Sequence, residues 1–212
     1  MFITFEGIEG SGKSLQIRRV EKYLNQKNLR CLVTREPGGT GLGLALRQVL
    51  LREGGPRREP VTELLLYLAD RYQHVNEVIQ PALDRGIIVL CDRFHDATRV
   101  YQGFARRLPP ELIDALAAAL RIPEPDLTIL LDVDPTVGLA RARSRDQAKG
   151  PDTDEGRFEA EDISFHRDVR KGYLALAESA PKRVRVIDSS GSEDEVFDRI
   201  QALLKTWLST KS

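Results

Sequence analysis

The chain has 212 residues, of which 41% are hydrophobic and 30% charged, and its formal net charge is zero. This composition is typical of a globular domain and argues against a disordered or membrane-embedded chain. No apolar run in the sequence reaches the roughly 20 residues that a bilayer requires, and a balanced charge does not favour nucleic acid. We therefore expect one cytoplasmic domain over residues 1–212, with no signal peptide and no nucleic-acid or membrane partner.

Five short apolar runs predict strands that are covered on both faces. They are Phe2–Glu6, Cys31–Arg35, Ile87–Asp92, Leu127–Val133 and Val184–Asp188. The intervening segments predict helices at Lys13–Gln26, Leu42–Arg52, Val61–Asp84, Pro110–Leu120, Pro135–Ser144, Glu159–Glu178 and Glu193–Ser209. Such alternation indicates an α/β fold with a mainly parallel sheet, whose ligands bind beyond the carboxyl ends of the strands.

Three local features add detail to this fold. Pro81 falls in the final turns of a long predicted helix and is able to kink it, and the polar segment 146–156 predicts a mobile loop. The two cysteines lie in apolar runs and predict buried, inert thiols of a reducing compartment. The three histidines have no spacing suited to a metal site, so we expect surface or loop positions for His74, His95 and His166.

A glycine-rich motif follows the first predicted strand and opens the first predicted helix. Residues 7–14 read GIEGSGKS and match G-x-x-x-x-G-K-[ST] in full, in the context that a P-loop requires. The glycines let backbone N–H groups surround a phosphate at the positive end of the helix. We expect the catalytic Lys13 to reach the β- and γ-phosphates and Ser14 to bind Mg²⁺. The predicted ATP-binding residues are Gly7, Ile8, Glu9, Gly10, Ser11, Gly12, Lys13 and Ser14.

Further motifs follow the later predicted strands. TREPGGT occupies residues 34–40, DRF 92–94 and YQG 101–103, and these are followed by DLTILLDV at 126–133, RARSR at 141–145 and RFE at 157–159. On these motifs the chain resembles the thymidylate (dTMP) kinases from Phe2 to about Trp207. The resemblance implies a P-loop NTPase-type fold with three layers, a five-stranded parallel sheet and a lid at about residues 141–159. It also implies that ATP and dTMP are the substrates, that Mg²⁺ is the cofactor and that the protein is a homodimer.

The acceptor phosphate needs charge neutralisation and no catalytic base, because a nucleoside monophosphate already carries close to two negative charges at neutral pH. Arg93 at a strand end and Arg47 on the neighbouring helix are suited to a bidentate clamp, and the resemblance implies that role. A structural ion pair for Arg93 and a solvated position for Arg47 remain open. The resemblance also implies that Arg35 and Gln102 belong to the dTMP site.

Two aspartates end apolar strands. Asp92 occupies the place of a Walker-B carboxylate near Mg²⁺, with a catalytic role partly through water, although a carboxylate there could instead cap the next helix. Asp132 ends the fourth predicted strand, and we expect a structural role for it.

The resemblance assigns the sugar and the base of the acceptor to five residues. Glu9 is implied to accept a hydrogen bond from the 3′-hydroxyl, and Tyr101 to crowd the 2′ position and favour deoxyribose. Tyr67 and Arg71 lie four residues apart and so share one helix face; they are implied to stack on thymine and to donate to its O4. Thr98 is implied to contact the base edge. Core packing of Tyr67 remains the alternative.

The predicted lid begins with three arginines spaced by two, which cannot all share one helix face. The resembled family has one type with an arginine at the position of Gly10, and a bacterial type that supplies this arginine from the lid. Gly10 together with Arg145 matches the bacterial type, so we expect catalysis by Arg145. Arg141 is suited to stacking on adenine, whereas Arg143 is suited to a solvated face. The RFE motif at 157–159 is implied to organise the closed lid.

Two other functions compete with this interpretation. Another P-loop nucleoside or nucleotide kinase with a different base specificity would share residues 7–14 and 92–93, but it would leave TREPGGT, Glu9 and the Tyr67/Arg71 pair unexplained. A regulatory P-loop ATPase would need a switch region and a water-positioning residue, and no such signature is evident in the sequence.

Overall fold

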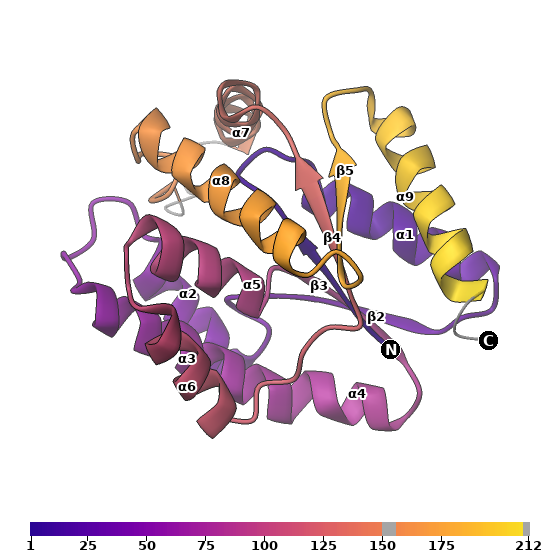
Figure 1. The fold of residues 1–212 in the computed structure, drawn as a ribbon, viewed down its shortest axis with the longest axis horizontal. Coiled ribbons are helices and arrows are strands. Elements are labelled where there is room, and N and C mark those ends of the chain that lie inside the picture. The colour runs from indigo at the N-terminus through magenta and orange to yellow at the C-terminus, as the bar shows by residue number, and fades with distance from the viewer. Residues whose placement is uncertain (150–155, 210–212) are drawn as a thin grey trace.

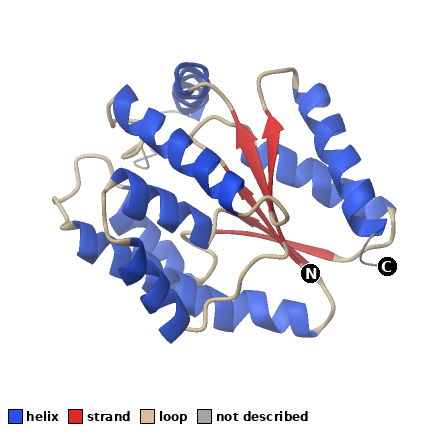
Figure 2. Cartoon of the chain, in the orientation of Figure 1, coloured by secondary structure: helices blue, strands red, loops and turns tan. Residues whose placement is uncertain are grey.

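The computed structural model describes residues 1–149 and 156–209, with side chains described outside residues 145–149. Five parallel strands form one sheet in the order β2-β3-β1-β4-β5. The strands are β1 (Phe2–Glu6), β2 (Cys31–Arg35), β3 (Ile88–Asp92), β4 (Leu127–Asp132) and β5 (Val184–Asp188). They confirm the five predicted strands, two of which are one residue shorter than expected. Figure 2 shows these strands, in red, between helices on both faces of the sheet.

Helices cover both faces because the side chains of each strand alternate in direction. Ile3 and Phe5 face a core formed with Ile17 of α1 and Leu204 of α9, whereas Phe2 faces a second core formed with the chain around Ile79. The resulting three layers confirm the predicted P-loop NTPase-type architecture (Figure 1). The helical elements of the described chain are α1 (Lys13–Gln26), α2 (Gly41–Leu51), α3 (Pro60–His74), η1 (Val75–Ile79), α4 (Gln80–Asp84), α5 (His95–Thr98), η2 (Arg99–Ala105), α6 (Pro110–Ala119), α7 (Pro135–Lys149), α8 (Ile163–Ser179) and α9 (Glu193–Ser209).

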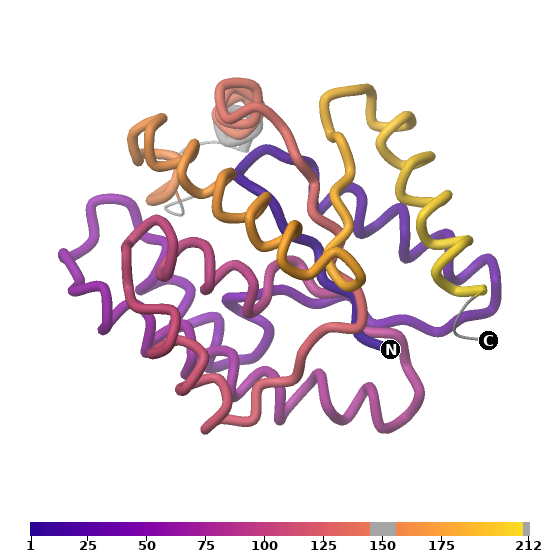
Figure 3. The backbone as a smooth tube through the Cα atoms, viewed as in Figure 1, coloured from indigo at the N-terminus to yellow at the C-terminus, as the bar shows by residue number. Residues whose placement is uncertain are grey.

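The register of the sheet brings the predicted functional motifs to one edge. Asp92 pairs in register with Arg35 on one side and with Phe5 on the other. Because all strands are parallel, their carboxyl ends meet at this edge, where the phosphate loop, TREPGGT and DRF all begin. Figure 3 shows the loop that follows β1, in indigo, passing close to α7.

The long helix predicted at 61–84 is divided by a π-helical segment. η1 lies between α3 and α4, and the backbone N–H of Gln80 donates to Val75 O, five residues earlier. Pro81 has no N–H, and its ring crowds the carbonyl four residues before it, so a widened turn relieves the crowding. The helix therefore continues through Pro81, and the irregular turn precedes it.

The local structure differs from the sequence-based expectation at three further places. α7 continues to Lys149, beyond the predicted end at Ser144, because residues 145–149 include neither glycine nor proline. The predicted loop 146–156 is therefore helical up to Lys149, and its residues 150–155 lie outside the described chain. α8 begins at Ile163, after turns at residues 157–160 that were predicted to be partly helical. Residues 95–105 form α5 and η2, which were not predicted.

The described chain contains no helix that is both long and apolar enough to cross a membrane.

Candidate functional site

The phosphate loop folds as the motif predicts. Gly7, Gly10 and Gly12 have φ values of 138°, 70° and 92°, which side chains disfavour, and α1 begins directly after them at Lys13. A Cβ at Gly10 would lie 1.9 Å from the carbonyl oxygen of Gly138 in α7. The loop and α7 are thus in backbone contact, and Gly10 leaves no room for a side chain in this conformation.

The ammonium group of Lys13 lies within the curve of the loop. Its Nζ donates to Gly7 O at 3.0 Å and to Ile8 O at 2.9 Å, and the side chain is buried. Burial and the positive charge of Arg93 lower the pKa of Lys13 to about 8, against the opposing influence of Asp92. A bound polyphosphate would favour the charged form of Lys13, because an anion stabilises a nearby ammonium.

The two predicted Mg²⁺ ligands lie side by side. Ser14 Oγ donates to Asp92 Oδ2 at 2.7 Å, although the two residues are 78 positions apart. Hydroxyl and carboxylate oxygens are suitable Mg²⁺ ligands, and Mg²⁺ usually takes its remaining ligands from water and phosphate. The pair therefore fits a magnesium ion that arrives with a nucleotide. The described residues hold no group of three or more His, Cys, Asp or Glu side chains that would form an all-protein metal site.

A cavity of about 660 Å³ extends from this loop to α3. Its lining includes Lys13 and Ser14 at the loop end. It also includes every residue that sequence analysis assigned to the dTMP site, namely Glu9, Arg35, Arg47, Tyr67, Arg71, Arg93, Thr98, Tyr101 and Gln102. The fold therefore brings both predicted substrate sites into one cavity.

Arg93 occupies the boundary between the two ends of the cavity. Its φ of 68° lies in the left-handed region, which costs an arginine about 1–2 kcal/mol. The guanidinium donates to Glu9 Oε1 at 2.8 Å and to the Tyr173 hydroxyl at 3.3 Å. Arg47 donates to Pro37 O at 2.8 Å, so its position depends on the TREPGGT segment. These contacts hold both guanidinium groups against the cavity wall.

Glu9 is buried beside a histidine that sequence analysis placed at the surface. Its Oε1 accepts a hydrogen bond from the Tyr101 hydroxyl at 2.8 Å, and its Oε2 lies 3.3 Å from His166 Nδ1 in α8. Burial alone would raise the pKa of Glu9, but Arg93, His166 and Lys13 together hold it well below its ordinary value. Glu9 is therefore a buried carboxylate that stays ionised.

The end of the cavity away from the loop holds the predicted base-binding residues. Tyr67 is largely buried, and burial raises the pKa of its hydroxyl, which therefore stays protonated. Arg71 donates to Thr98 Oγ1 at 2.8 Å and to Glu36 Oε2 at 2.7 Å. Gln102 Nε2 donates to Glu63 at 2.8 Å. An aromatic ring and fixed polar groups thus line this end of the cavity.

The arginines of the predicted lid are distributed differently. Arg141 donates to Ser189 O at 3.0 Å and is absent from the cavity lining found among the described residues, while the Ser189 hydroxyl donates to Ser11 O of the phosphate loop at 2.6 Å. Arg143 is exposed. The backbone of Arg145 lies in α7, but its side chain falls outside the described part of the chain, so its catalytic role remains a prediction.

Several buried polar residues around the cavity were not predicted from the sequence. His74, His95 and His166 are all at most 4% exposed, so the expectation of surface positions was wrong. His95 has its pKa lowered to about 3, mainly by burial and secondly by Arg71, and is therefore neutral. Their only sequence signal was their placement in or beside motif-bearing helices. Asp132 has the structural role that was expected, because Arg170 donates to both of its oxygens at 2.7 and 2.8 Å.

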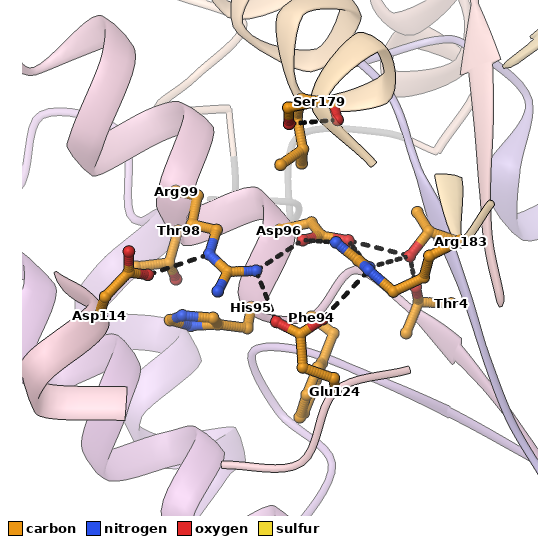
Figure 4. A network of polar contacts seen from close by, with 12 residues as sticks. Thr4, Phe94, His95, Asp96, Thr98, Arg99, Asp114, Glu124, Ser179 and Arg183 are labelled. Atoms are coloured by element: carbon orange, nitrogen blue, oxygen red, sulfur yellow. Dashed lines mark hydrogen bonds and ion pairs between the residues drawn. The ribbon is translucent and has the colours of Figure 1, made fainter. Parts of the chain in front are cut away.

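A separate polar network fixes α5 behind the cavity (Figure 4). Asp96 accepts hydrogen bonds from Arg183 at 2.6 and 3.0 Å and from Thr128 of β4 at 2.9 Å. Burial would raise the pKa of Asp96, but the bonds from Arg183 outweigh this effect and the net pKa is lowered. Arg99, the first residue of η2, donates hydrogen bonds to Asp96 and to Glu124. The network ties the segment that carries Thr98 to the sheet.

The residues of the cavity define a class of enzyme. A P-loop with its lysine, serine and Walker-B-type aspartate can hold a donor triphosphate, and the same cavity offers arginines, a carboxylate and an aromatic ring to a second nucleotide. This combination is that of a P-loop phosphotransferase that acts on nucleotides.

Comparison with known proteins places the chain within that class. The family model described as "Thymidylate kinase" matches residues 5–200. The chain is 49% identical to a thymidylate kinase of Oleidesulfovibrio alaskensis, covering 95% of this chain and 96% of the relative. It is also 49% identical to one of Nitratidesulfovibrio vulgaris, covering 99% and 98%. A crystal structure of thymidylate kinase from Ehrlichia chaffeensis superposes with a TM-score of 0.77 at 32% identity, covering 96% and 98%. The chain belongs to the thymidylate kinase family.

Proposed function

We propose that this enzyme transfers the γ-phosphoryl group of ATP to dTMP, giving dTDP and ADP. The observation that carries the proposal is the single cavity in which the P-loop residues Lys13 and Ser14 face the predicted acceptor residues. Phosphoryl transfer depends on holding two nucleotides in line and neutralising their charge. One cavity with a donor end and an acceptor end meets both requirements.

At the donor end, the phosphate loop holds the triphosphate. Loop N–H groups and Lys13 neutralise its negative oxygens, and the pair formed by Ser14 and Asp92 offers ligands for Mg²⁺. When bound with the nucleotide, Mg²⁺ supplies further charge neutralisation. These roles of individual residues are part of the proposal.

At the acceptor end, Arg93 and Arg47 bind the phosphate of dTMP as a positively charged pair. The phosphate oxygen is already anionic near neutral pH, so it attacks the γ-phosphorus without a general base. The ionised Glu9 accepts a hydrogen bond from the sugar 3′-hydroxyl, and Tyr101, which lies against it, limits the space near the 2′ position. Tyr67 stacks on thymine, and Arg71 donates to its O4 with Thr98 beside it.

The lid arginine Arg145 completes the charge neutralisation in this proposal. Gly10 leaves no space for a side chain beside Gly138, so an arginine could not be accommodated at that position of the loop without moving α7. A cation supplied by α7 is the alternative source, because α7 contacts the loop directly. This arrangement corresponds to the bacterial type of the family.

We also propose a cytoplasmic homodimer. Val61, Leu65 and Tyr72 each expose roughly half of their surface, and with Ala69 they form one apolar stripe along α3. The neighbouring α2 adds the exposed side chains of Leu42 and Val49. An apolar surface of this kind favours association with a second copy of the chain.

An acceptor series tests the proposed function. The purified enzyme with ATP and Mg²⁺ should release ADP far faster with dTMP than with dUMP, dCMP or AMP in a coupled assay. Equal rates with all four acceptors would disprove the thymine assignment and leave a kinase of another specificity. No acceptor-dependent ADP release at all would disprove the kinase activity itself.

A further inference from the structure

A buried carboxylate lies directly behind the base-binding end of the cavity. Glu36, from the TREPGGT motif, is 3% exposed. Its Oε2 accepts a hydrogen bond from Arg71 Nε at 2.7 Å, and its Oε1 lies 2.8 Å from His74 Nδ1. Each oxygen therefore holds a different side chain of α3, and the two contacts fix the orientation of the carboxylate.

The histidine on the far side of Glu36 is itself immobilised. Thr34 Oγ1 lies 2.6 Å from His74 Nε2, so both ring nitrogens have partners. A Cβ at Gly39 would lie 2.3 Å from the His74 ring, which shows that the TREPGGT backbone packs directly on it. The segment 34–40 thus supports Glu36 from two directions and leaves it little freedom to move.

The other contacts of Arg71 complete the orientation of its guanidinium. Nη1 donates to Thr98 Oγ1 at 2.8 Å and lies 3.4 Å from His95 Nδ1, while Nη2 donates to Phe94 O at 3.0 Å. A guanidinium carries five N–H groups. Contacts with described residues account for four of them, which leaves one on Nη2, and Arg71 lines the cavity. Because the guanidinium is planar and rigid, the direction of that remaining donor depends on the bond that Nε makes to Glu36.

We propose that Glu36 is a positioning residue that aims Arg71 at the acceptor base and thereby sets the preference for thymine over cytosine. This inference rests on the proposed function. Position 4 of thymine is a carbonyl acceptor, whereas position 4 of cytosine is an amino donor. A fixed donor on Arg71 satisfies the first and opposes the second, and this discrimination weakens if the guanidinium can turn away.

Two conservative variants separate the position of the Glu36 carboxylate from its charge. Glu36→Asp keeps the charge but withdraws the carboxylate from Arg71 and His74. Glu36→Gln keeps the length, and its amide can still accept from Arg71 Nε and donate to His74 Nδ1 once the ring proton moves to Nε2, facing Thr34. The positioning role therefore predicts a larger loss in the aspartate variant than in the glutamine variant.

The experiment compares kcat/KM for dTMP, dUMP and dCMP in the wild type and in both variants. In Glu36→Asp the dTMP-to-dCMP ratio should fall about tenfold, the usual scale for losing one well-placed hydrogen bond to a charged group. The dTMP-to-dUMP ratio should stay within about twofold, because both bases keep the O4 carbonyl. Glu36→Gln should keep most of the dCMP discrimination. Leu204→Ala serves as the control for lost stability, because it removes core packing in α9 on the other face of the sheet. This variant should lower the free energy of unfolding without changing either ratio.

Each other outcome overturns a defined part of the proposal. An unchanged dTMP-to-dCMP ratio in Glu36→Asp would show that Glu36 does not position Arg71. Equal falls in both ratios would show general loosening of the cavity. A larger loss of dCMP discrimination in Glu36→Gln than in Glu36→Asp would show that the charge of Glu36 and not its position is decisive. If the wild type itself phosphorylated dCMP as well as dTMP, the proposed function would fail, whatever the variants did.

Discussion

Glu9 and Arg93 form an ion pair with 2.8 Å between Oε1 and Nη2, at the point where the phosphate loop meets the acceptor end of the cavity. The two residues are 84 positions apart, and both follow neighbouring strands of the sheet. Glu9 lies in a loop whose backbone N–H groups attract anions, and the ion pair with Arg93 explains why a carboxylate is stable there. The pair also fixes the position of Arg93, the cation that we propose to bind the acceptor phosphate.

Loss of the Glu9 charge should weaken acceptor binding more than donor binding. Glu9→Gln removes the ionic partner of Arg93 and the charged acceptor for the sugar hydroxyl, so we expect KM for dTMP to rise about tenfold. KM for ATP should change by about twofold or less, since the loop backbone and Lys13 remain. Initial-rate kinetics check this, with the exposed Glu111→Gln as control. Equal rises in both KM values would contradict the role.

Removal of the Asp92 carboxylate should raise the magnesium requirement. Asp92→Asn keeps the shape beside Ser14 Oγ but removes the negative charge, so we expect the half-saturating Mg²⁺ concentration to rise about tenfold. Asp132→Asn is a matched control, because that strand-end carboxylate bonds Arg170 instead. The two variants are compared by measuring the reaction rate as a function of Mg²⁺ concentration at a fixed ATP concentration. A similar rise of the half-saturating Mg²⁺ concentration in both variants would exclude a specific role for Asp92.

The buried carboxyl of Glu6 should make stability fall as the pH rises. Burial first, and Asp96 second, raise the pKa of Glu6 from 4.5 to about 7, despite the opposing charge of Arg93. A raised folded-state pKa contributes stability that is complete below about pH 4.5 and is lost as the pH rises through 7. Linkage sets this contribution on the order of 3 kcal/mol.

Glu6→Gln tests this, because an amide cannot ionise. Urea unfolding between pH 5 and 8.5 should show the free energy of unfolding of the wild type falling, relative to the variant, as the pH rises. The Phe94 N–H and the Tyr173 hydroxyl donate to Glu6, so the variant loses part of that bonding at every pH. A pH-independent difference between the two proteins would show that Glu6 does not titrate in this range.

The lid proposal predicts a rate effect without an affinity effect. Arg145→Ala removes a cation that acts on the transferring phosphoryl group, so we expect kcat to fall about a hundredfold or more with little change in KM for dTMP. Arg143→Ala, two residues away on the same helix and exposed, should retain kcat within about threefold. Single-turnover kinetics provide the measurement. Near-normal turnover in Arg145→Ala would rule out the lid arginine.

The apolar stripe of α3 predicts a dimer that one charge can break. Leu65→Asp places a carboxylate in the middle of the stripe, and we expect the variant to elute and scatter light as a monomer. Val137→Asp also changes an exposed apolar residue, but at the start of α7, and should remain dimeric. A monomeric wild type, or a dimeric Leu65→Asp, would disprove this interface.

The strands, the phosphate loop and the edge of the sheet at which the site lies could all be predicted from the amino-acid sequence alone. These features depend on short-range chemistry: apolar runs define the strands, and three glycines with a lysine and a serine define the loop. Because parallel strands end at a common edge, the predicted residues Asp92, Arg93 and Glu9 had to come together there. Their close contacts follow from topology and not from a special arrangement of the sequence.

The pairing of the polar side chains behind the cavity could not be predicted, because it depends on how distant elements pack together. Glu36 and Arg71 are 35 positions apart, and Glu9 and His166 belong to elements at opposite ends of the chain. A buried histidine and an exposed one look alike in a single sequence, because burial depends on which helices pack over it. The helical segment at 95–105 has the same origin, since distant hydrogen bonds from Thr128 and Arg183 to Asp96 outweigh local propensity there.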